Sequence, residues 1–244
     1  MTSLPHDRLR RYHSIARIHS GRHRPEHGLY SITEAAAMVA GEPHTLWPQS
    51  VAPTIAAFLN RAGDIASDQE RQELIPLIPI ILDTNDPETE QYAAAALCHT
   101  ATRIWAPLTL RASQWPDMAD ALSQATTLQE AAATSAQLLE QLNSMKRPHG
   151  RKKINLADDL LTVCNIYASA IAATEDHPFE HDPDYRKDRT KTHRSGATIA
   201  ADILGAAAQA TQGQQPAQQV KVARTALHTV HQLLAPTGNT NPLQ

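Results

Sequence analysis

Apolar residues recur along the chain in amphipathic stripes, and the densest apolar run lies at residues 67–82, SDQERQELIPLIPIIL. Ser67 followed by Glu70 is the signature of a helix N-terminus, because the serine caps an exposed amide while the glutamate bonds back to the capping residue. The apolar residues that follow should lie in the core. Pro76 and Pro79 each remove a hydrogen-bond donor and crowd the preceding turn, so they do not fit a regular helix interior. We therefore expect a helix that ends just before Pro76, followed by a buried, kinked passage.

Stripes with a three- to four-residue period predict helices along the rest of the chain. The expected helices begin near residues 31, 51, 67, 87, 116, 127, 155, 197 and 216. Several of these starts carry a capping signature, such as Ser31 with Glu34 and Thr127 with Glu130. No run alternates apolar and polar residues with a period of two, which argues against strands. We therefore predict an all-α fold, a bundle-like array of about eight or nine helices.

Two interruptions of the stripes indicate how the chain is divided. Residues 1–28 hold six Arg and five His with few apolar residues, which is typical of a mobile basic arm. The sequence MKRPHGRKK breaks the pattern again and predicts a basic linker over residues 146–154. We expect a helical body over residues 29–145 and a smaller helical lobe over residues 155–244. Within that lobe, a long polar loop is predicted at about 175–196.

Composition adds a charge asymmetry to this arrangement. Apolar residues make up 41% of the chain and aromatic residues only 4%, so alanine-rich helices must pack closely around Leu, Ile and Val. The net charge of −3 hides three different segments. Residues 1–30 carry six basic and two acidic side chains, residues 31–144 carry four and fourteen, and residues 145–244 carry twelve and nine. An acidic body between basic ends bears on the choice of partners rather than on the fold.

The sequence gives no sign of export or of a membrane segment. There is no run of about 18 apolar residues to span a bilayer, and the amino terminus lacks an apolar signal segment. Cys98 and Cys164 lie in helical stripes without paired spacing, so we expect reduced, buried thiols. These features predict a cytoplasmic protein without a membrane partner.

Residues 33–112 contain a recognisable order of features: a helix ending in an Ala-Gly-Glu-Pro turn, a proline-bearing loop, a helix with an Asp near its end, then an Arg and an Ile-Pro run. In this chain they are residues 40–43, Pro48, Pro53, Asp64, Arg71 and residues 77–79. With these features the chain resembles an uncharacterised family of helical hypothetical proteins from high-GC Gram-positive bacteria. Where that family often has Asp-His-Pro, this chain has Leu46, Trp47 and Pro48. The resemblance implies an all-helical fold and a bacterial cytosolic origin, and it implies no activity.

The richest cluster of chemically able side chains lies in the predicted loop, in the sequence EDHPFEHDPDYRKDRTKTHR at residues 175–194. Imidazole and carboxylate groups are the ligands that zinc, manganese and iron take, and a carboxylate can act as a base toward bound water. The candidate metal ligands are His177, His181, Asp182, Asp184 and His193. Their spacing matches no established metal signature, and prolines interrupt the segment, so a solvated charged loop is the competing interpretation. We predict no cofactor, with a divalent metal ion at this loop as the alternative.

Basic clusters in the arm and the linker are candidates for contact with phosphates or with an acidic partner. Binding to phosphates would weaken steeply with salt. The candidate contact residues are Arg10, Arg11, Arg22, Arg24, Lys146, Arg147, Arg151, Lys152 and Lys153. No aromatic platform or nucleic-acid-binding motif accompanies them, and the pI is near 6.5.

These observations predict a non-enzymatic helical interaction or accessory protein, with a regulatory role among its possible forms. Its expected partner is another protein, and homo-oligomers are an open alternative. The first competing hypothesis is a metal-dependent hydrolase or nuclease centred on the loop at residues 175–194. The second is a nucleic-acid-binding protein that uses the basic arm and linker. The sequence has no phosphate-cradling glycine loop and no serine in a nucleophile turn to favour another class of enzyme.

Overall fold

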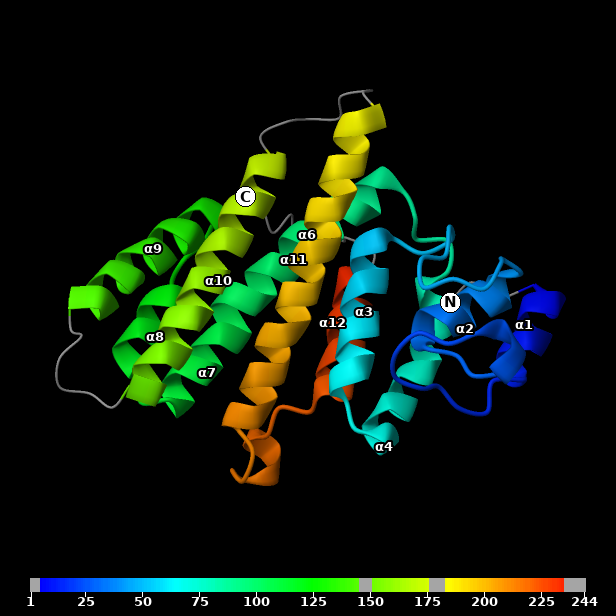
Figure 1. Ribbon diagram of the computed structural model, residues 1–244, viewed down its shortest axis with the longest axis horizontal. Helices are drawn as coiled ribbons and strands as arrows, with labels where there is room; N and C mark the ends of the chain where they lie inside the picture. Colours follow the sequence, from blue (N-terminus) through cyan, green and yellow to red (C-terminus); the bar gives the residue numbers. More distant parts are fainter. Residues whose placement is uncertain (1–4, 145–150, 176–182, 235–244) are drawn as a thin grey trace. The chain divides into compact units, whose positions relative to one another are not determined.

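The computed structural model describes residues 5–144, 151–175 and 183–234, without the side chains of residues 151–156, 174–175 and 183–189 (Figure 1). Every regular element in these ranges is a helix, which confirms the predicted all-α fold. In chain order the elements are α1 (His6–His13), η1 (Pro25–His27), α2 (Ile32–Ala40), α3 (Pro53–Ile65), α4 (Asp68–Arg71), η2 (Gln72–Leu77), α5 (Ile78–Ile81), α6 (Pro87–Thr100), the π-helical turn η3 (Ala101–Trp105), α7 (Ala106–Ala112), α8 (Pro116–Ser123), α9 (Leu128–Ser144), α10 (Arg151–Glu175), α11 (Pro183–Ala210), η4 (Pro216–Gln218) and α12 (Val222–Leu233). There are more short elements than expected, because two proline-containing segments are divided into shorter helical pieces. One consists of α4, η2 and α5, and the other of α6, η3 and α7.

The described residues form two compact units. Unit 1 contains residues 5–93 and 221–234, and unit 2 contains residues 94–144, 151–175 and 183–220. This division differs from the predicted body and lobe, because the chain passes from unit 1 to unit 2 within α6 and returns to unit 1 for α12. A charged, proline-containing stretch in the sequence predicts where one helix ends and the next begins. It does not predict which of the helices share a core.

The apolar run at residues 67–82 lies in the core of unit 1 as a chain of short helical pieces. Pro76 falls inside the 3-10 turn η2, and Pro79 lies in the first turn of α5, so neither proline interrupts a regular α-helical ladder. The fully buried side chains of the run are Leu74, Leu77, Ile78 and Ile81. The last helix, α12, packs on η2, α3 and α4 (Figure 1). The predicted buried, kinked passage is confirmed.

Local capping signals set the helix boundaries as the sequence predicted. The Ser31 side chain accepts from the Glu34 amide at the start of α2, and Ser67 does the same for Glu70 at the start of α4. The C-terminus of α2 ends on Gly41, whose φ of 83° lies in the left-handed region that glycine adopts without strain. In unit 2 the π-helical turn η3 widens the helix just before Pro107, which lies in the first turn of α7. The helical course therefore continues past this proline instead of ending at it.

Helices α10 and α11 pack against each other in unit 2, and α10 also packs along α9 (Figure 1). Here the structure overturns the polar loop predicted at about 175–196, because α11 begins at Pro183 and proline suits the first helical position. Gly196 lies inside α11, where an added Cβ would meet Cε2 of Tyr167 at 2.4 Å. The close approach of the two helices therefore outweighs the low helix propensity of glycine. Likewise α10 begins at Arg151, inside the predicted linker.

Candidate functional site

The predicted metal ligands are not brought together within the described structure. His177, His181 and Asp182 lie outside the described residues, and Asp184 lies in the first turn of α11, where side chains are not described. His193 lies in the same helix and is 2% exposed. In the parts of the chain whose side chains are described, no group of three or more His, Cys, Asp or Glu is placed to hold a metal ion.

Two of the predicted contact residues of the arm are engaged within unit 1. Arg10 pairs with Asp7 at 2.5 Å on α1. Arg11 donates from Nη1 to the carbonyl oxygen of Val39 at 3.0 Å, close to the C-terminal end of α2. A cation there satisfies a terminal carbonyl and interacts favourably with the helix dipole. Arg11 is thus a structural residue rather than a free contact.

The other predicted contact residues have different fates. Arg22 and Arg24 are exposed. Lys146 and Arg147 lie outside the described residues. Arg151, Lys152 and Lys153 form the first turn of α10, and their side chains are not described. Of the side chains in this set that the structure describes, Arg10, Arg22 and Arg24 are exposed and Arg11 is bonded to α2, so a basic contact surface stays a prediction.

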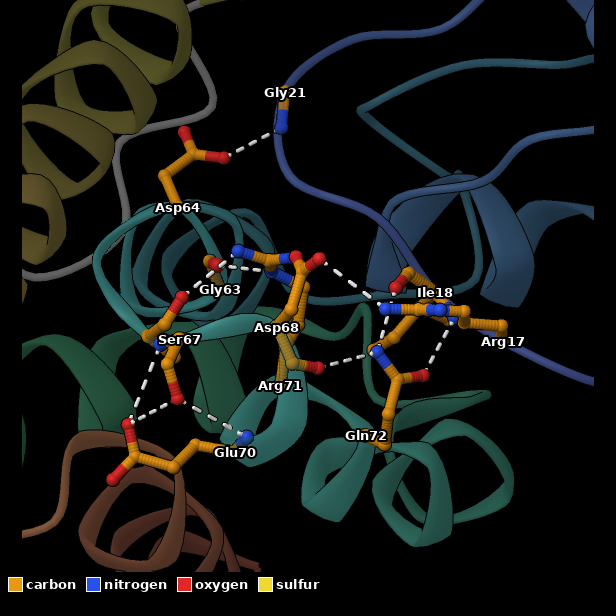
Figure 2. A network of polar contacts seen from close by, with 11 residues as sticks. Arg17, Ile18, Gly21, Gly63, Asp64, Ser67, Asp68, Glu70, Arg71 and Gln72 are labelled. Carbon is orange, nitrogen blue, oxygen red and sulfur yellow. Dashed lines mark hydrogen bonds and ion pairs between the residues drawn. The ribbon is translucent and has the colours of Figure 1, made fainter.

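The N-terminal segment is packed on unit 1, unlike the mobile arm expected from the sequence. We call residues 14–30, which lead from α1 to α2, the strap. The backbone of Ile18 pairs with the side-chain amide of Gln72 in both directions, each bond at 2.9 Å (Figure 2). The Ile18 side chain is 0% exposed. Three residues later the N–H of Gly21 donates to Oδ1 of Asp64 at 2.7 Å. The strap is thus held by one buried apolar side chain and by hydrogen bonds from the backbone on either side of it.

A buried arginine organises the surface under the strap. Arg71 is 5% exposed and donates to two carbonyl oxygens at the end of α3, from Nε to Gly63 at 2.6 Å and from Nη2 to Ala66 at 2.8 Å (Figure 2). Its Nη1 donates to Oδ1 of Asp68 at 2.5 Å, while Oδ2 of Asp68 accepts from Arg17 of the strap at 3.2 Å. The hydrogen bond from Arg71 lowers the pKa of Asp68. This carboxylate therefore stays charged where the cation of the strap meets it.

A second anchor holds the strap to the start of α2. Glu34 is 1% exposed; its Oε1 accepts from the N–H of His23 at 3.0 Å, and its Oε2 accepts from the N–H of Ser31 at 2.8 Å. Nε2 of His44 lies 3.2 Å from Oε1 of Glu34 and 2.9 Å from the carbonyl oxygen of His23, so one proton on Nε2 serves both acceptors. The buried carboxylate has donors on both oxygens, as a buried charge requires. The Glu34–His44 pair therefore serves to hold the chain in place.

Unit 2 has a groove between α10 and α11 with a volume of about 370 Å³. Its lining residues are Ile166, Tyr167, Ala170, Lys191, Thr192, Ser195, Gly196 and Ile199. Ile166 is 57% exposed although it is a large aliphatic residue. Lys191 and Ser195 are also exposed, whereas the ring of Tyr167 is buried against Gly196. The groove thus combines an apolar wall with a cation.

The core beside the groove is chemically inert. Burial raises the pKa of Tyr167 well above its ordinary value and raises the pKa of Cys164 to about 12. The hydroxyl of Tyr167 is buried and has no hydrogen-bond partner among the described residues. Cys98 and Cys164 are both buried free thiols, as predicted. Neither the phenol of Tyr167 nor the thiol of Cys164 supplies a nucleophile near neutral pH.

Sequence reasoning missed both the strap surface and the groove. No pattern in the sequence indicated that Gln72 binds the strap. A glutamine whose side-chain amide pairs with a backbone has the same surroundings in the sequence as any other polar residue of a helix. The charge asymmetry between the basic N-terminus and the acidic body was the available signal for the strap. For the groove, the signal was Ile166, an aliphatic residue that falls outside the buried stripe of its helix.

Comparisons with protein-family models, with curated proteins and with solved structures found no match. Among the described residues, no helix is both long and apolar enough to cross a membrane.

Proposed function

We propose that this chain is a non-enzymatic interaction protein whose α10–α11 groove holds an acidic, amphipathic segment of a partner protein. The observation that carries the proposal is the exposure of Ile166, 57%, on the wall of a groove that also contains Lys191. An exposed aliphatic side chain next to a concave apolar surface favours association, because a partner that covers it removes apolar area from water. The same side chain on a convex surface would need no explanation.

The charge near the groove selects the partner. Lys191 belongs to α11, and residues 183–194 of that helix carry five basic and two acidic side chains in the sequence. Oppositely charged surfaces steer association and disfavour wrong partners. The exposed side chain of Ser195 lies along the same wall and adds a hydroxyl group to it. An apolar segment flanked by Asp or Glu is the chemistry that matches this groove.

Site-specific photocrosslinking tests the proposal. A benzoylphenylalanine at position 166 of the full chain, made in the organism that naturally produces it, should give one discrete adduct under ultraviolet light. Mass spectrometry should identify the crosslinked segment as net acidic. Lys191→Glu should reduce the adduct about tenfold or more, because a like charge would then face the partner.

The matched control is Ile104, which is 54% exposed and does not line the groove. The same photoprobe at position 104 should give no comparable adduct. Equal adducts from positions 104 and 166, no adduct at all, or an adduct unchanged by Lys191→Glu would each overturn the proposal.

A metal-dependent hydrolase or nuclease stays a prediction, because His177, His181 and Asp182 lie outside the described residues. Metal analysis of the purified full chain tests it. Stoichiometric zinc or manganese that is lost in His177→Ala would favour this class over an interaction protein.

A further inference from the structure

We propose that the surface under the strap is a second binding site, specific for a basic, extended segment of a partner protein that carries one aliphatic anchor. In the structure the strap itself occupies this site. The site is separate from the α10–α11 groove, and the two proposals use different residues.

The contacts of the strap define what the site recognises. Gln72 offers a donor and an acceptor to the backbone of a single residue, which is how an extended chain is read in peptide recognition. The side chain of that residue, Ile18, is fully buried. Asp64 then accepts from the N–H of Gly21, and Asp68 accepts from the residue before the anchor, Arg17. The recognised pattern is a basic residue, an aliphatic anchor and, three residues later, a glycine.

The charge of the site sets the class of the partner. The groups that face the strap include the carboxylates of Asp64 and Asp68 (Figure 2). The carboxylate of Glu34 also faces the strap. They come from a part of the sequence, residues 31–144, with fourteen acidic and four basic side chains. A nucleic acid would be repelled by these carboxylates, whereas a basic peptide is complementary to them.

The site is built from contacts that do not depend on the strap. Arg71 is fixed by the carbonyl oxygens of Gly63 and Ala66 and holds Asp68 in turn. Glu70 and Ser67 form a closed capping box beside it (Figure 2). These bonds persist when the strap leaves, so the surface is preorganised for a second occupant.

The strap is held by few core contacts. From Pro5 to Tyr30, only Ile18 is buried. Backbone groups of the strap form hydrogen bonds with side chains of the helical body, and Arg17 forms an exposed ion pair with Asp68. No helix of the body continues into these contacts. Segments with few buried contacts open at low free-energy cost. The strap is therefore an internal competitor that a partner segment displaces.

A peptide-binding experiment tests the inference. The probe is a fluorescein-labelled peptide with the sequence of residues 14–24, SIARIHSGRHR, and the readout is fluorescence anisotropy with the full chain. An attached competitor acts at an effective concentration in the millimolar range, so the wild-type chain should bind the peptide weakly. The double variant Arg8→Glu/Arg17→Glu reverses the charge in two ion pairs, that of Arg8, in α1 just before the strap, with Asp83 and that of Arg17, in the strap itself, with Asp68. It should bind the peptide at least about tenfold more tightly.

Further variants identify where the peptide binds. Gln72→Ala, added to the double variant, should abolish binding, and a peptide with Ile18→Asp should not bind. Gln69→Ala is the matched control, because Gln69 is an exposed glutamine one turn away that makes no bond to the strap among those described. Circular dichroism of each variant checks that the helices are intact.

Three outcomes would overturn the inference. The first is a folded double variant that does not bind the peptide. The second is equal loss of binding in Gln69→Ala and Gln72→Ala. The third is a double variant that forms a concentration-dependent dimer in light scattering, since the occupant would then be the strap of a second copy.

Discussion

The strap surface of unit 1 and the α10–α11 groove of unit 2 are opposite kinds of surface. Under the strap, nearly every recognition group is polar and already has a partner, and a single aliphatic side chain, Ile18, is buried. In the groove, the wall is mainly apolar and Ile166 faces water. One surface is occupied and the other is open.

The difference shows how each surface would obtain specificity. Hydrogen bonds are directional, so Gln72 and Asp64 fix the register of an extended chain to a single residue. Apolar burial is non-directional and scales with area, so the groove would rely on shape and on the charge of Lys191. Mutations should therefore act sharply at the strap surface and gradually in the groove.

The largest expected effect concerns the buried cation that organises the strap surface. Arg71→Met keeps most of the side-chain volume but removes the bonds to Gly63 and Ala66. Hydrogen bonds from charged groups are worth about 1.5–3 kcal/mol each, so unit 1 should lose roughly 3 kcal/mol of unfolding free energy. Hydrogen exchange of peptides from α3 and α4, followed by mass spectrometry, measures this loss within unit 1.

Arg111→Met is the control for the loss of an arginine. Arg111 pairs with Asp120 at 2.5 Å, and both side chains are about half exposed. An exposed ion pair contributes roughly 0–1 kcal/mol, so this variant should change little. A similar loss in both variants would mean that the carbonyl bonds of Arg71 are not what stabilises the surface.

The next expected effect concerns the dry core beside the groove and depends on pH. Burial raises the pKa of Cys164 to about 12, compared with 9.0 for an ordinary thiol. The folded chain therefore keeps this proton after the unfolded chain has begun to release it. The associated stability is fully present below about pH 9 and is lost as the pH rises toward 12, at about 1.4 kcal/mol per pH unit.

Cys164→Ala isolates this dependence from other groups that titrate in alkali. Urea unfolding between pH 9 and about pH 10.5, a range over which the thiol accounts for about 2 kcal/mol, should show a steeper decline of stability for the wild-type chain than for the variant. Parallel declines would show that water reaches the thiol and that the core under the groove is not dry.

A smaller effect is expected where α10 and α11 touch. In Gly196→Ala the new Cβ would meet Cε2 of Tyr167 at 2.4 Å. Overpacking costs about 1–3 kcal/mol, and the better helix propensity of alanine returns up to about 1 kcal/mol, so the net loss should be about 1 kcal/mol. Gly63→Ala in α3 is the matched control, because the nearest neighbour of its Cβ would be Leu74 Cδ1 at 3.9 Å. Urea unfolding should show the two substitutions acting in opposite directions.

Much of the fold could be predicted from sequence because its signals are local. A serine with a glutamate three residues later marked the starts of α2 and α4, and the structure contains both capping boxes. The proline spacing in residues 67–82 predicted the broken, buried passage for a steric reason that needs no tertiary information. The prediction of a polar loop at 175–196 was wrong because the helix there depends on a contact that is distant in the sequence. Gly196 fits in α11 because it packs against Tyr167, which lies 29 positions earlier, at 167 compared with 196.

The candidate sites were harder to predict because they depend on which segments meet. The pairing of Ile18 with Gln72 joins residues 54 positions apart. Nothing in the pattern around either residue specifies that contact. The charge asymmetry between the basic N-terminus and the acidic body was interpreted as a signal for an outside partner, whereas in the structure the two segments contact each other. The groove depends equally on the meeting of α10 with α11.

The smallest expected effect is a gain of stability at the base of the groove. The hydroxyl of Tyr167 is buried and has no partner among the described residues, so it carries a desolvation cost that a phenylalanine would not. Tyr167→Phe should raise the unfolding free energy by about 0.5–1 kcal/mol in urea unfolding, whereas Tyr92→Phe, at a partly exposed site in α6, should be neutral. If Tyr167→Phe instead lowered stability by about 1 kcal/mol, the hydroxyl would have a polar partner. The base of the groove would then be hydrated. Both surfaces would recognise their occupants through hydrogen bonds, and the contrast between an apolar groove and a polar strap surface would no longer hold.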